Sequence, residues 1–330
     1  MLAEKFTERE LGDQKHLLRP RSHSTVATYK MYLRLYVRPR WDAQVATKIS
    51  HHAIQDWLQD LKRDHNLANK TVGHLKGLMA QVYKFGRYYE LVPDSCDPCK
   101  KVRCESSSEY EPRIISPEEA YKVWCQLLKK PEGTATAEST LVLLVAASGL
   151  RISEALGLKW SDIDPEAELI RVRRSWTMDQ LGKPKSKASR AAVPCVGVLS
   201  AHLQAWRNQS QYAGDDDWVF ASSRNRGQTP RSGSTLVADY LKAAAYRAGV
   251  LKEGERVRFG AHTLRHSLAT FLIAKGSDVK TVQTLLRHAN PMTTLSIYAH
   301  GRSQDRSDAQ EDMLTAFFAP AAKPPTDVLQ

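Results

Sequence analysis

Apolar residues recur every three or four positions through the first hundred residues of the chain, which is the period of an amphipathic helix. Ser24 can serve as the N-cap of the first such stretch, since its hydroxyl can accept a hydrogen bond from a helical N–H. The pattern predicts an all-helical domain over residues 24–104, preceded by a polar, flexible leader over residues 1–23. Its three apolar stripes are Tyr29, Tyr32, Leu33 and Tyr36; Ile54, Leu58 and Leu61; and Val72, Leu75, Leu78, Met79, Val82, Tyr83 and Phe85.

A change of composition marks the end of this helical region. Pro93 and Pro98 interrupt the helical pattern, because proline lacks the backbone N–H that a helix interior needs. The chain then becomes polar and rich in serine from Glu105 onward. We predict a linker over residues 105–113, a second domain over residues 114–305, and a C-terminal helix and tail over residues 306–330.

The second domain mixes helical and strand-like patterns. Ser116 and Pro117 are typical of a helix start, and the apolar run that ends at Gly149 predicts a buried helix over residues 139–148. The fold class that we expect is mostly α with a small antiparallel β-sheet, in which a helical domain precedes a mixed α/β domain. Strands are predicted at residues 169–176 and 192–194, around a lysine-rich turn at 182–190, and at 218–220; helices are predicted near 234–248, 263–275, 278–287 and 293–299.

The chain is strongly basic. It has 48 lysines and arginines against 36 aspartates and glutamates, which gives 48 − 36 = +12. A surplus of this size favours a polyanionic partner, and nucleic acid is the default candidate. The longest apolar stretch, residues 141–148, is too short to cross a membrane, and the N-terminus lacks the apolar core of a secretory signal. We therefore expect a cytoplasmic protein that does not associate with a membrane.

Basic side chains flank the third apolar stripe of the helical domain. A helix with an apolar face and basic flanks can lie in a DNA groove, so these residues are candidates for DNA binding. A basic face exposed to solvent is an equally good interpretation of the spacing alone. The candidates are Lys70, Lys76, Lys84 and Arg87.

The chain has five cysteines, and an odd number without a secretory signal argues against a disulfide framework. Cys96, Cys99 and Cys104 lie close together, but a zinc site needs a fourth ligand that is absent nearby in the sequence. His262 and His266 have the spacing of a zinc pair, yet no glutamate follows His262 to serve as a base. We therefore favour free thiols and predict no metal site.

Three separated segments of the second domain carry residues suited to phosphate chemistry. They are Gly-Leu-Arg-Ile-Ser-Glu (149–154), His-Thr-Leu-Arg-His (262–266), and Leu-Leu-Arg-His followed by Ile-Tyr-Ala-His (285–300). Arg151 and Arg265 can bind phosphate oxygens, because a guanidinium group stays charged and donates hydrogen bonds in a fork. His262 and His288 can hydrogen-bond and protonate a phosphate, and Tyr298 can attack it. This set predicts phosphoryl transfer through a covalent phosphotyrosine, for which neither a metal nor a cofactor is needed.

These segments resemble the tyrosine recombinases, and phage-type integrases are the most similar group. The resemblance rests on residues 149–164, 261–270 and 285–300, which occur in the order of the family, and it covers residues 114–300. It implies a two-domain fold, in which a helical core-binding domain precedes a mixed α/β catalytic domain.

The resemblance also implies a role for each residue. Arg151 and Arg265 would clamp the phosphate. His262 and His288 would hydrogen-bond it and assist proton movement. Tyr298 would form a 3′-phosphotyrosyl link. Glu154 corresponds to an acidic position that supports the site. The general acid of the family is a hairpin lysine, for which this chain offers Lys183, Lys185 and Lys187; Lys185 fits best and Lys187 is its close rival.

One position departs from the pattern of the family, which usually has glycine before the residue that corresponds to His288. This chain has Arg287 there. Its side chain could crowd the DNA or add a phosphate contact, and we therefore include it among the candidate DNA-binding residues.

The function implied by the resemblance is that of a site-specific DNA recombinase, an integrase of a mobile element. Its partner would be double-stranded DNA, on which four protomers would assemble, whereas the free protein would be a monomer or a weak oligomer. Two alternatives are a type IB topoisomerase, which shares the chemistry, and a DNA-binding protein without catalysis. The amphipathic segment at residues 310–318 would pack on a neighbouring protomer or on its own domain.

Overall fold

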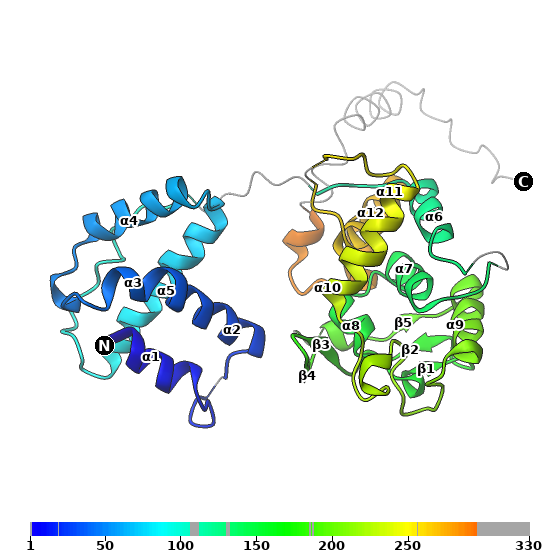
Figure 1. Cartoon of the computed structure of the whole chain (residues 1–330), viewed down its shortest axis with the longest axis horizontal. Coiled ribbons are helices and arrows are strands. Elements are labelled where there is room, and N and C mark those ends of the chain that lie inside the picture. The colour runs from blue at the N-terminus through cyan, green and yellow to red at the C-terminus, as the bar shows by residue number, and fades with distance from the viewer. Residues whose placement is uncertain are drawn as a thin grey trace, which may run out of the picture. The chain divides into compact units, whose positions relative to one another are not determined.

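The computed structural model describes residues 2–18, 20–105, 112–129, 133–184, 186, 188–255 and 257–295. The chain divides into two compact units, residues 1–111 and 112–330. Each unit has a hydrophobic core of its own, and each is drawn in Figure 1.

The described part of the N-terminal unit is helical. Its elements are α1 (Leu2–Leu11), α2 (His23–Tyr32), the π-helical turn η1 (Leu33–Val37), α3 (Arg38–Trp41), η2 (Ala46–Lys48), α4 (His51–Asp64) and α5 (Asn69–Tyr88). The hydroxyl of Ser22, rather than that of the expected Ser24, caps α2 by accepting a hydrogen bond from the backbone N–H of Thr25. The helix therefore begins one position before Ser24.

The flexible leader that we expected over residues 1–23 is wrong for its first half. Residues 2–11 form helix α1, which packs against α5 and buries Ala3, Phe6 and Leu11 in the core. Phe6 lies edge-on to Phe85 of α5, with ring centroids 5.6 Å apart. The polar residues that suggested a leader lie on the outer face of a short amphipathic helix.

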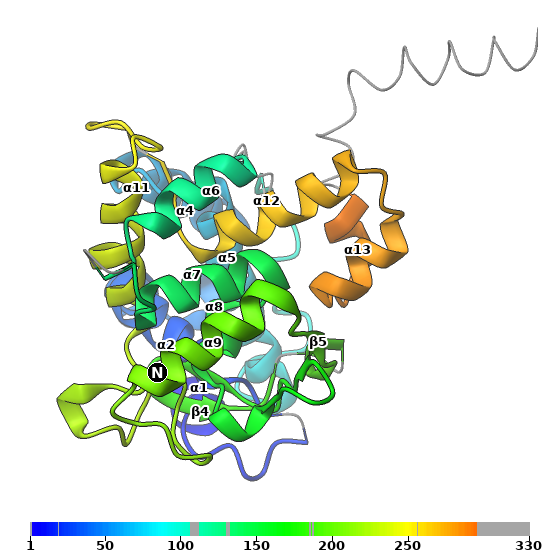
Figure 2. The same cartoon turned by 90° about the vertical axis from the view of Figure 1, so that its right-hand side faces the viewer.

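The C-terminal unit is built around α7 (Ala137–Ser148). Helix α7 packs against α6 (Pro117–Cys125), α8 (Ile152–Leu156), α9 (Gly197–Gln209), α12 (Ala261–Ala274) and the π-helical segment η6 (Leu236–Lys242). Figure 2 shows α7 between α6 and α12 on one side and α9 on the other. The remaining helices of the described residues are η3 (Trp160–Asp162), η4 (Ala188–Arg190), η5 (Ser223–Asn225), α10 (Gly233–Thr235), α11 (Ala243–Arg247) and α13 (Val279–Leu286).

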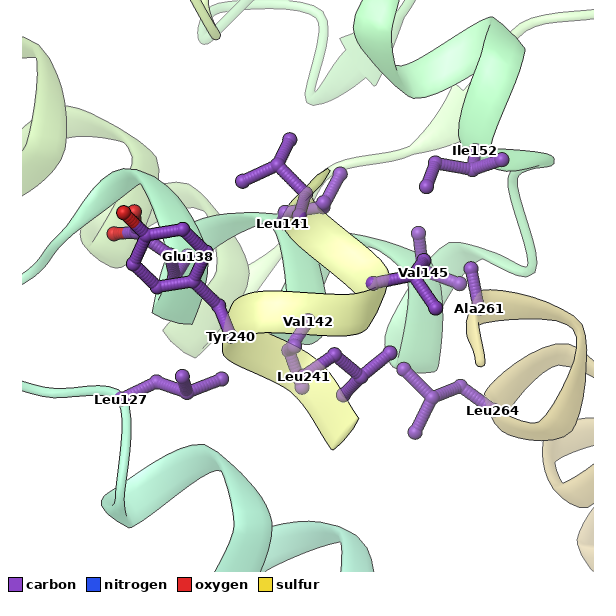
Figure 3. A pocket seen from close by; sticks show the side chains of 12 residues that line it. Leu127, Glu138, Leu141, Val142, Val145, Ile152, Tyr240, Leu241, Ala261 and Leu264 are labelled. Atoms are coloured by element: carbon purple, nitrogen blue, oxygen red, sulfur yellow. The ribbon is translucent and has the colours of Figure 1, made fainter. Parts of the chain in front are cut away.

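Apolar side chains fill the space between α7, η6 and α12 (Figure 3). Leu141 and Val145 of α7 face Leu241 of η6 and Leu264 of α12 there. The cavity that remains among these side chains is about 10 Å³, which is room for at most a single water molecule. This region is packed core, and it is not a ligand site.

Two small antiparallel sheets complete the unit. Strand β2 (Leu169–Ile170) lies between β1 (Ile163–Asp164) and β5 (Val193–Pro194), and β3 (Ser175–Thr177) forms a hairpin with β4 (Gln180–Gly182). The hairpin turns at Met178 and Asp179, both with positive φ, as a two-residue turn requires.

The strand predictions were partly wrong. Residues 169–176 do not form one strand, because the chain leaves the first sheet after Ile170 and enters the second at Ser175. The turn of the hairpin lies at residues 178–179 rather than in the lysine-rich segment 182–190. Residues 218–220 form a single bridge between Trp218 and Lys159 instead of a strand. Of the helix expected at 293–299, the described residues 293–295 are helical and the rest lies outside the described range.

Candidate active site

Helix α7 ends where Arg151 must be placed. Gly149 follows the helix with φ +62°, a left-handed conformation that glycine adopts without strain. A Cβ at this position would lie 2.5 Å from Cδ2 of Leu286 in α13. The chain therefore turns sharply at a glycine, which adopts this conformation without strain and leaves room for Leu286, and Arg151 begins the next helix, α8, two positions later.

Arg151 and Glu154 form an ion pair on the first turn of α8. Arg151 donates from NH1 to Oε1 of Glu154 over 2.8 Å, and its backbone N–H donates to Oε2 over 3.0 Å. The NH1 group also donates to Oγ of Ser189 over 3.0 Å. The side chain of Arg151 is 26% exposed, whereas that of Glu154 is 2% exposed. The side chain of Arg151 is thus fixed by Glu154 and Ser189 and is still partly exposed to solvent.

Arg265, on the first turns of α12, is almost completely buried. Its guanidinium group donates hydrogen bonds to the carbonyl oxygens of Gly149 and Leu286, at the C-terminal ends of α7 and α13. Helix C-termini carry partial negative charge and therefore attract a cation. Burial, followed by repulsion from Arg151, lowers the pKa of Arg265 to about 9, so it remains a cation at neutral pH. Arg265 joins the two helix ends that flank the site.

His262 lies one turn before Arg265 on α12, and its side chain is exposed. Burial of part of the ring, together with the charges of Arg265 and Arg151, lowers its pKa below the usual value of 6.5. His266 has a lowered pKa for the same leading reason, burial, to which His262 and Arg265 add. Both rings are therefore neutral at neutral pH and can either donate or accept a proton.

His288 follows α13 and is buried. Its Nδ1 is 2.9 Å from Oγ1 of Thr294, and its backbone carbonyl accepts a hydrogen bond from Nε2 of Gln283 over 3.1 Å. Burial, reinforced by the charges of Arg265 and Arg151, lowers its pKa to about 4. The ring is thus oriented and neutral.

Arg287 does not lie on the surface, and its inclusion among the DNA-binding residues was wrong. Its side chain is 1% exposed. The guanidinium group donates from NH2 to Oε2 of Glu154 over 2.8 Å and from NH1 to the carbonyl oxygen of Ser189 over 3.0 Å. The residue caps α13 with φ +54°, which costs about 1–2 kcal/mol for a residue other than glycine. This backbone conformation directs the side chain inward, toward Glu154 and Ser189.

The lysine and tyrosine candidates fall largely outside the described residues. Tyr298, Lys185 and Lys187 are among them, and only Lys183 of the hairpin lysines is described, with an exposed side chain. Their assignments therefore stay predictions. Ser186 lies between the two lysines and Ser189 follows them, and their hydroxyl groups lie 2.9 Å apart.

Sequence reasoning missed Ser189. Its hydroxyl accepts from Arg151 and its carbonyl accepts from Arg287, so it links two of the three arginines. A single serine in a lysine-rich turn gives no signal in one sequence, and only the packing of the turn on α8 reveals it.

The basic residues of α5 divide into two groups. Lys70 and Lys84 are exposed and lie on the same face of the helix as His74, while Lys76 is half-buried. Arg87 instead donates to the carbonyl oxygen of Cys96 over 2.8 Å and pairs with Asp97 over 3.1 Å. Arg87 therefore holds the segment after α5 in place, and we do not assign it a contact with DNA.

The cysteine cluster packs in the core of the N-terminal unit. Cys99 is buried, and burial raises the pKa of its thiol to about 12; Cys96 and Cys104 pack beside the same core as free thiols. In the part of the chain that the structure describes, no three His, Cys, Asp or Glu side chains are grouped to hold a metal ion. No helix among those residues is long and apolar enough to cross a membrane.

Comparison with known proteins places the chain in a class. The model of the phage integrase family matches residues 120–305, which is more than half of the chain. The chain belongs to the phage integrase family.

Relatives of this family match most of the chain. The tyrosine recombinase XerD of Caulobacter vibrioides is 30% identical over 247 residues, which cover 75% of this chain and 75% of the relative. The fold is similar to that of the Tn1549 transposon integrase in complex with circular intermediate DNA, with a TM-score of 0.74, 17% identity, and coverage of 95% and 99% of the two chains. It is also similar to a lambda integrase tetramer bound to a Holliday junction, with a TM-score of 0.65, 16% identity, and coverage of 88% and 77%.

Proposed function

We propose that this chain is a site-specific DNA recombinase, an integrase of a mobile element, which cuts and rejoins strands through a 3′-phosphotyrosyl intermediate. The observation that carries the proposal is a group of cations around one carboxylate. Arg151, Arg265 and Arg287 supply three positive charges and Glu154 one negative charge, so the group has a surplus of 3 − 1 = +2. A partly buried surplus of positive charge needs an anion, and a DNA phosphodiester supplies one.

In the cleavage step, Oη of Tyr298 attacks the scissile phosphorus. The bond from phosphorus to the 5′ oxygen breaks, and its electron pair goes to that oxygen, which takes a proton from Lys185 (or from its rival Lys187). The phenol has an ordinary pKa near 10 and must lose its proton during the attack. The neutral ring of His262 is suited to accept that proton.

The arginines act on the charge that develops during this step. Negative charge grows on the non-bridging phosphate oxygens in the transition state, and donors that are already fixed stabilise it without reorganising. Arg151 and Arg265 are both fixed by hydrogen bonds to the protein, and His288 is oriented by Thr294. Rejoining reverses the chemistry: a 5′ hydroxyl attacks the phosphotyrosine, and the tyrosine leaves. The covalent link conserves the bond energy, so neither ATP nor a metal enters this scheme.

The partner that we propose is double-stranded DNA, with four protomers on the DNA and a monomer or weak oligomer when free. The tetramer of lambda integrase on a Holliday junction supports this assembly. The exposed Lys70 and Lys84 of α5 are candidates for contacts to the DNA backbone. A DNA substrate also supports the expected cytoplasmic location.

Covalent trapping tests the proposal. Nicked duplexes tiled across the DNA that flanks the coding region serve as suicide substrates, since loss of the short fragment beyond the nick prevents rejoining. We expect wild-type protein to form an adduct that survives denaturing electrophoresis, and Tyr298→Phe to form none while its DNA binding is retained. Tyr240→Phe removes a phenol hydroxyl elsewhere in the same unit and should leave the adduct unchanged. Equal adduct from wild type and Tyr298→Phe would refute Tyr298 as the nucleophile.

Two alternatives predict other outcomes, and the family relatives favour the recombinase over both. A type IB topoisomerase would relax supercoiled plasmid that carries no flanking site. A DNA-binding protein without catalysis would bind the duplexes and form no adduct with any of them.

A further inference from the structure

Arg287 is energetically unfavourable at its position. It holds a left-handed conformation at the end of α13, its charged side chain is 1% exposed, and its Nε makes no hydrogen bond to the described residues. Glycine would relieve the backbone strain, and an apolar side chain would avoid the burial of a charge. A cation kept under these conditions calls for a compensating role.

The contacts of Arg287 point to that role, because they repeat those of Arg151. Arg151 has two side-chain anchors, Oε1 of Glu154 and Oγ of Ser189. Arg287 binds the other oxygen of the same carboxylate and the carbonyl group of the same serine. Both residues that hold the partly exposed Arg151, Glu154 and Ser189, therefore also accept hydrogen bonds from the buried Arg287.

The position of Arg287 in the chain extends this link. Arg287 is adjacent to His288, and Ser189 lies in the turn that follows the segment of Lys185 and Lys187. One side chain thus connects the end of α13, the start of α8 and the turn η4. These are the three segments that carry, or directly adjoin, Arg151, His288 and the candidate lysines.

We propose that Arg287 is a positioning residue, which fixes the Glu154 carboxylate and Ser189 so that the guanidinium group of Arg151 is preorganised for the scissile phosphate. This inference rests on the proposed function. Direct phosphate binding by Arg287 does not fit, since its side chain is 1% exposed and its guanidinium group is already paired with the carboxylate of Glu154.

The charge of Glu154 offers a readout that a purely structural role would not move. Arg151 on its own helix, Arg287 after α13, and Arg265 and His262 on α12 are the charged or titratable groups that influence this carboxylate. Burial alone would raise the pKa of Glu154, but Arg287 and Arg151 lower it overall. Loss of Arg287 therefore raises this pKa, and protonation of Glu154 should begin to release Arg151 at mildly acidic pH.

The experiment measures single-turnover formation of the covalent adduct by the full chain, on a nicked duplex that wild-type protein converts. The variants are Arg287→Met, Glu154→Gln and the double variant, with DNA affinity measured separately. We expect Arg287→Met to slow adduct formation by roughly 10- to 100-fold, less than the loss of a direct donor to the phosphate. DNA affinity should change little. The double variant should be no slower than the slower single variant, because both changes act through the same carboxylate.

Two further variants separate positioning from folding. Arg287→Gly removes the backbone strain, and we expect it to fold as wild type and to lose cleavage like Arg287→Met. Arg231→Met breaks a more exposed ion pair with Glu138, at the opposite end of α7, and should leave the rate unchanged. In Arg287→Met the rate of adduct formation should also fall on the acidic side of the pH profile. The double variant with Glu154→Gln should lack that fall, because glutamine does not titrate.

The outcomes distinguish this inference from the proposed function. Wild-type rates in Arg287→Met and Arg287→Gly would overturn the positioning role alone, as would losses that multiply in the double variant. Absence of adduct from wild-type protein on every flanking duplex would overturn the proposed function, and the positioning role with it.

Discussion

The cations of the two units are held in opposite ways. Lys70 and Lys84 of α5 are exposed on flexible side chains, whereas Arg265 and Arg287 of the C-terminal unit are buried and tied to carbonyl groups or to Glu154. Exposed lysines attract any nearby phosphate, and salt screens that attraction. Buried guanidinium groups are fixed before the substrate arrives. We propose from this contrast a division of roles: α5 determines the affinity for DNA, and the arginine cluster determines the rate of cleavage.

Removal of Arg265 should have the largest effect. We expect Arg265→Ala to slow single-turnover adduct formation by at least about 10²-fold, because in the proposed mechanism it removes a fixed cation that stabilises the transition state. Arg265→Lys keeps the charge but cannot donate to both Gly149 and Leu286 as a fork, so it should recover only part of the rate. Affinity for the duplex should fall far less than the rate. A loss confined to affinity would break the proposed division.

Acid should destabilise the buried side of the site through His288. Its pKa is about 4 in the folded protein against 6.5 for an ordinary histidine. Between these two pH values the unfolded chain binds a proton at this residue that the folded protein does not bind. The contribution of His288 to the free energy of unfolding is therefore fully present above pH 6.5. It is lost progressively as the pH drops toward 4, by up to about 3 kcal/mol.

Urea denaturation at pH 7 and pH 5 measures this dependence. The variant His288→Gln should lose less stability between the two pH values than wild type does. A variant in which Lys70 and Lys84 are both replaced by alanine should follow wild type. An equal loss in His288→Gln would show that other groups carry the acid sensitivity.

The smallest effect is expected from the lysines of α5. Replacement of Lys70 and Lys84 by alanine should weaken DNA binding several-fold and reduce the slope of log affinity against log salt by about 0.9 for each phosphate that is no longer neutralised. Adduct formation at saturating DNA should stay at the wild-type rate. Arg87→Ala is the matched control, since Arg87 already pairs with Asp97 and should leave the salt slope unchanged. A lower cleavage rate at saturation would join the two regions that the comparison separates.

Much of the fold and of the site follows from local sequence. Gly149 ends α7 because its left-handed conformation is a general way to stop a helix. At α6, the hydroxyl of Ser116 accepts a hydrogen bond from the backbone N–H of Glu119, and the carboxylate of Glu119 accepts one from the backbone N–H of Ser116. The pattern predicted a helix near residues 263–275, and the structure has α12 there, with Arg265 on its first turns. These features depend on neighbours within a few positions, which a pattern along the chain can capture.

What the sequence could not predict depends on distant neighbours. Arg287 looked like a surface arginine, and its inward direction follows from the backbone conformation after α13 and from Glu154, which lies 133 positions away in the chain. Helix α1 looked like a polar leader, because only contact with α5 and α2 makes use of its few apolar residues. In both cases long-range packing overrides the local pattern.

The bare Cα of Gly149 has one more consequence. Since Leu286 of α13 rests directly against it, the separation between the arginine side and the histidine side of the site is set by a missing side chain. An added Cβ would lie 2.5 Å from Cδ2 of Leu286, so that this side chain, two positions before His288, would have to shift. The packing beside His288 is therefore sensitive to a position that itself takes no part in the chemistry.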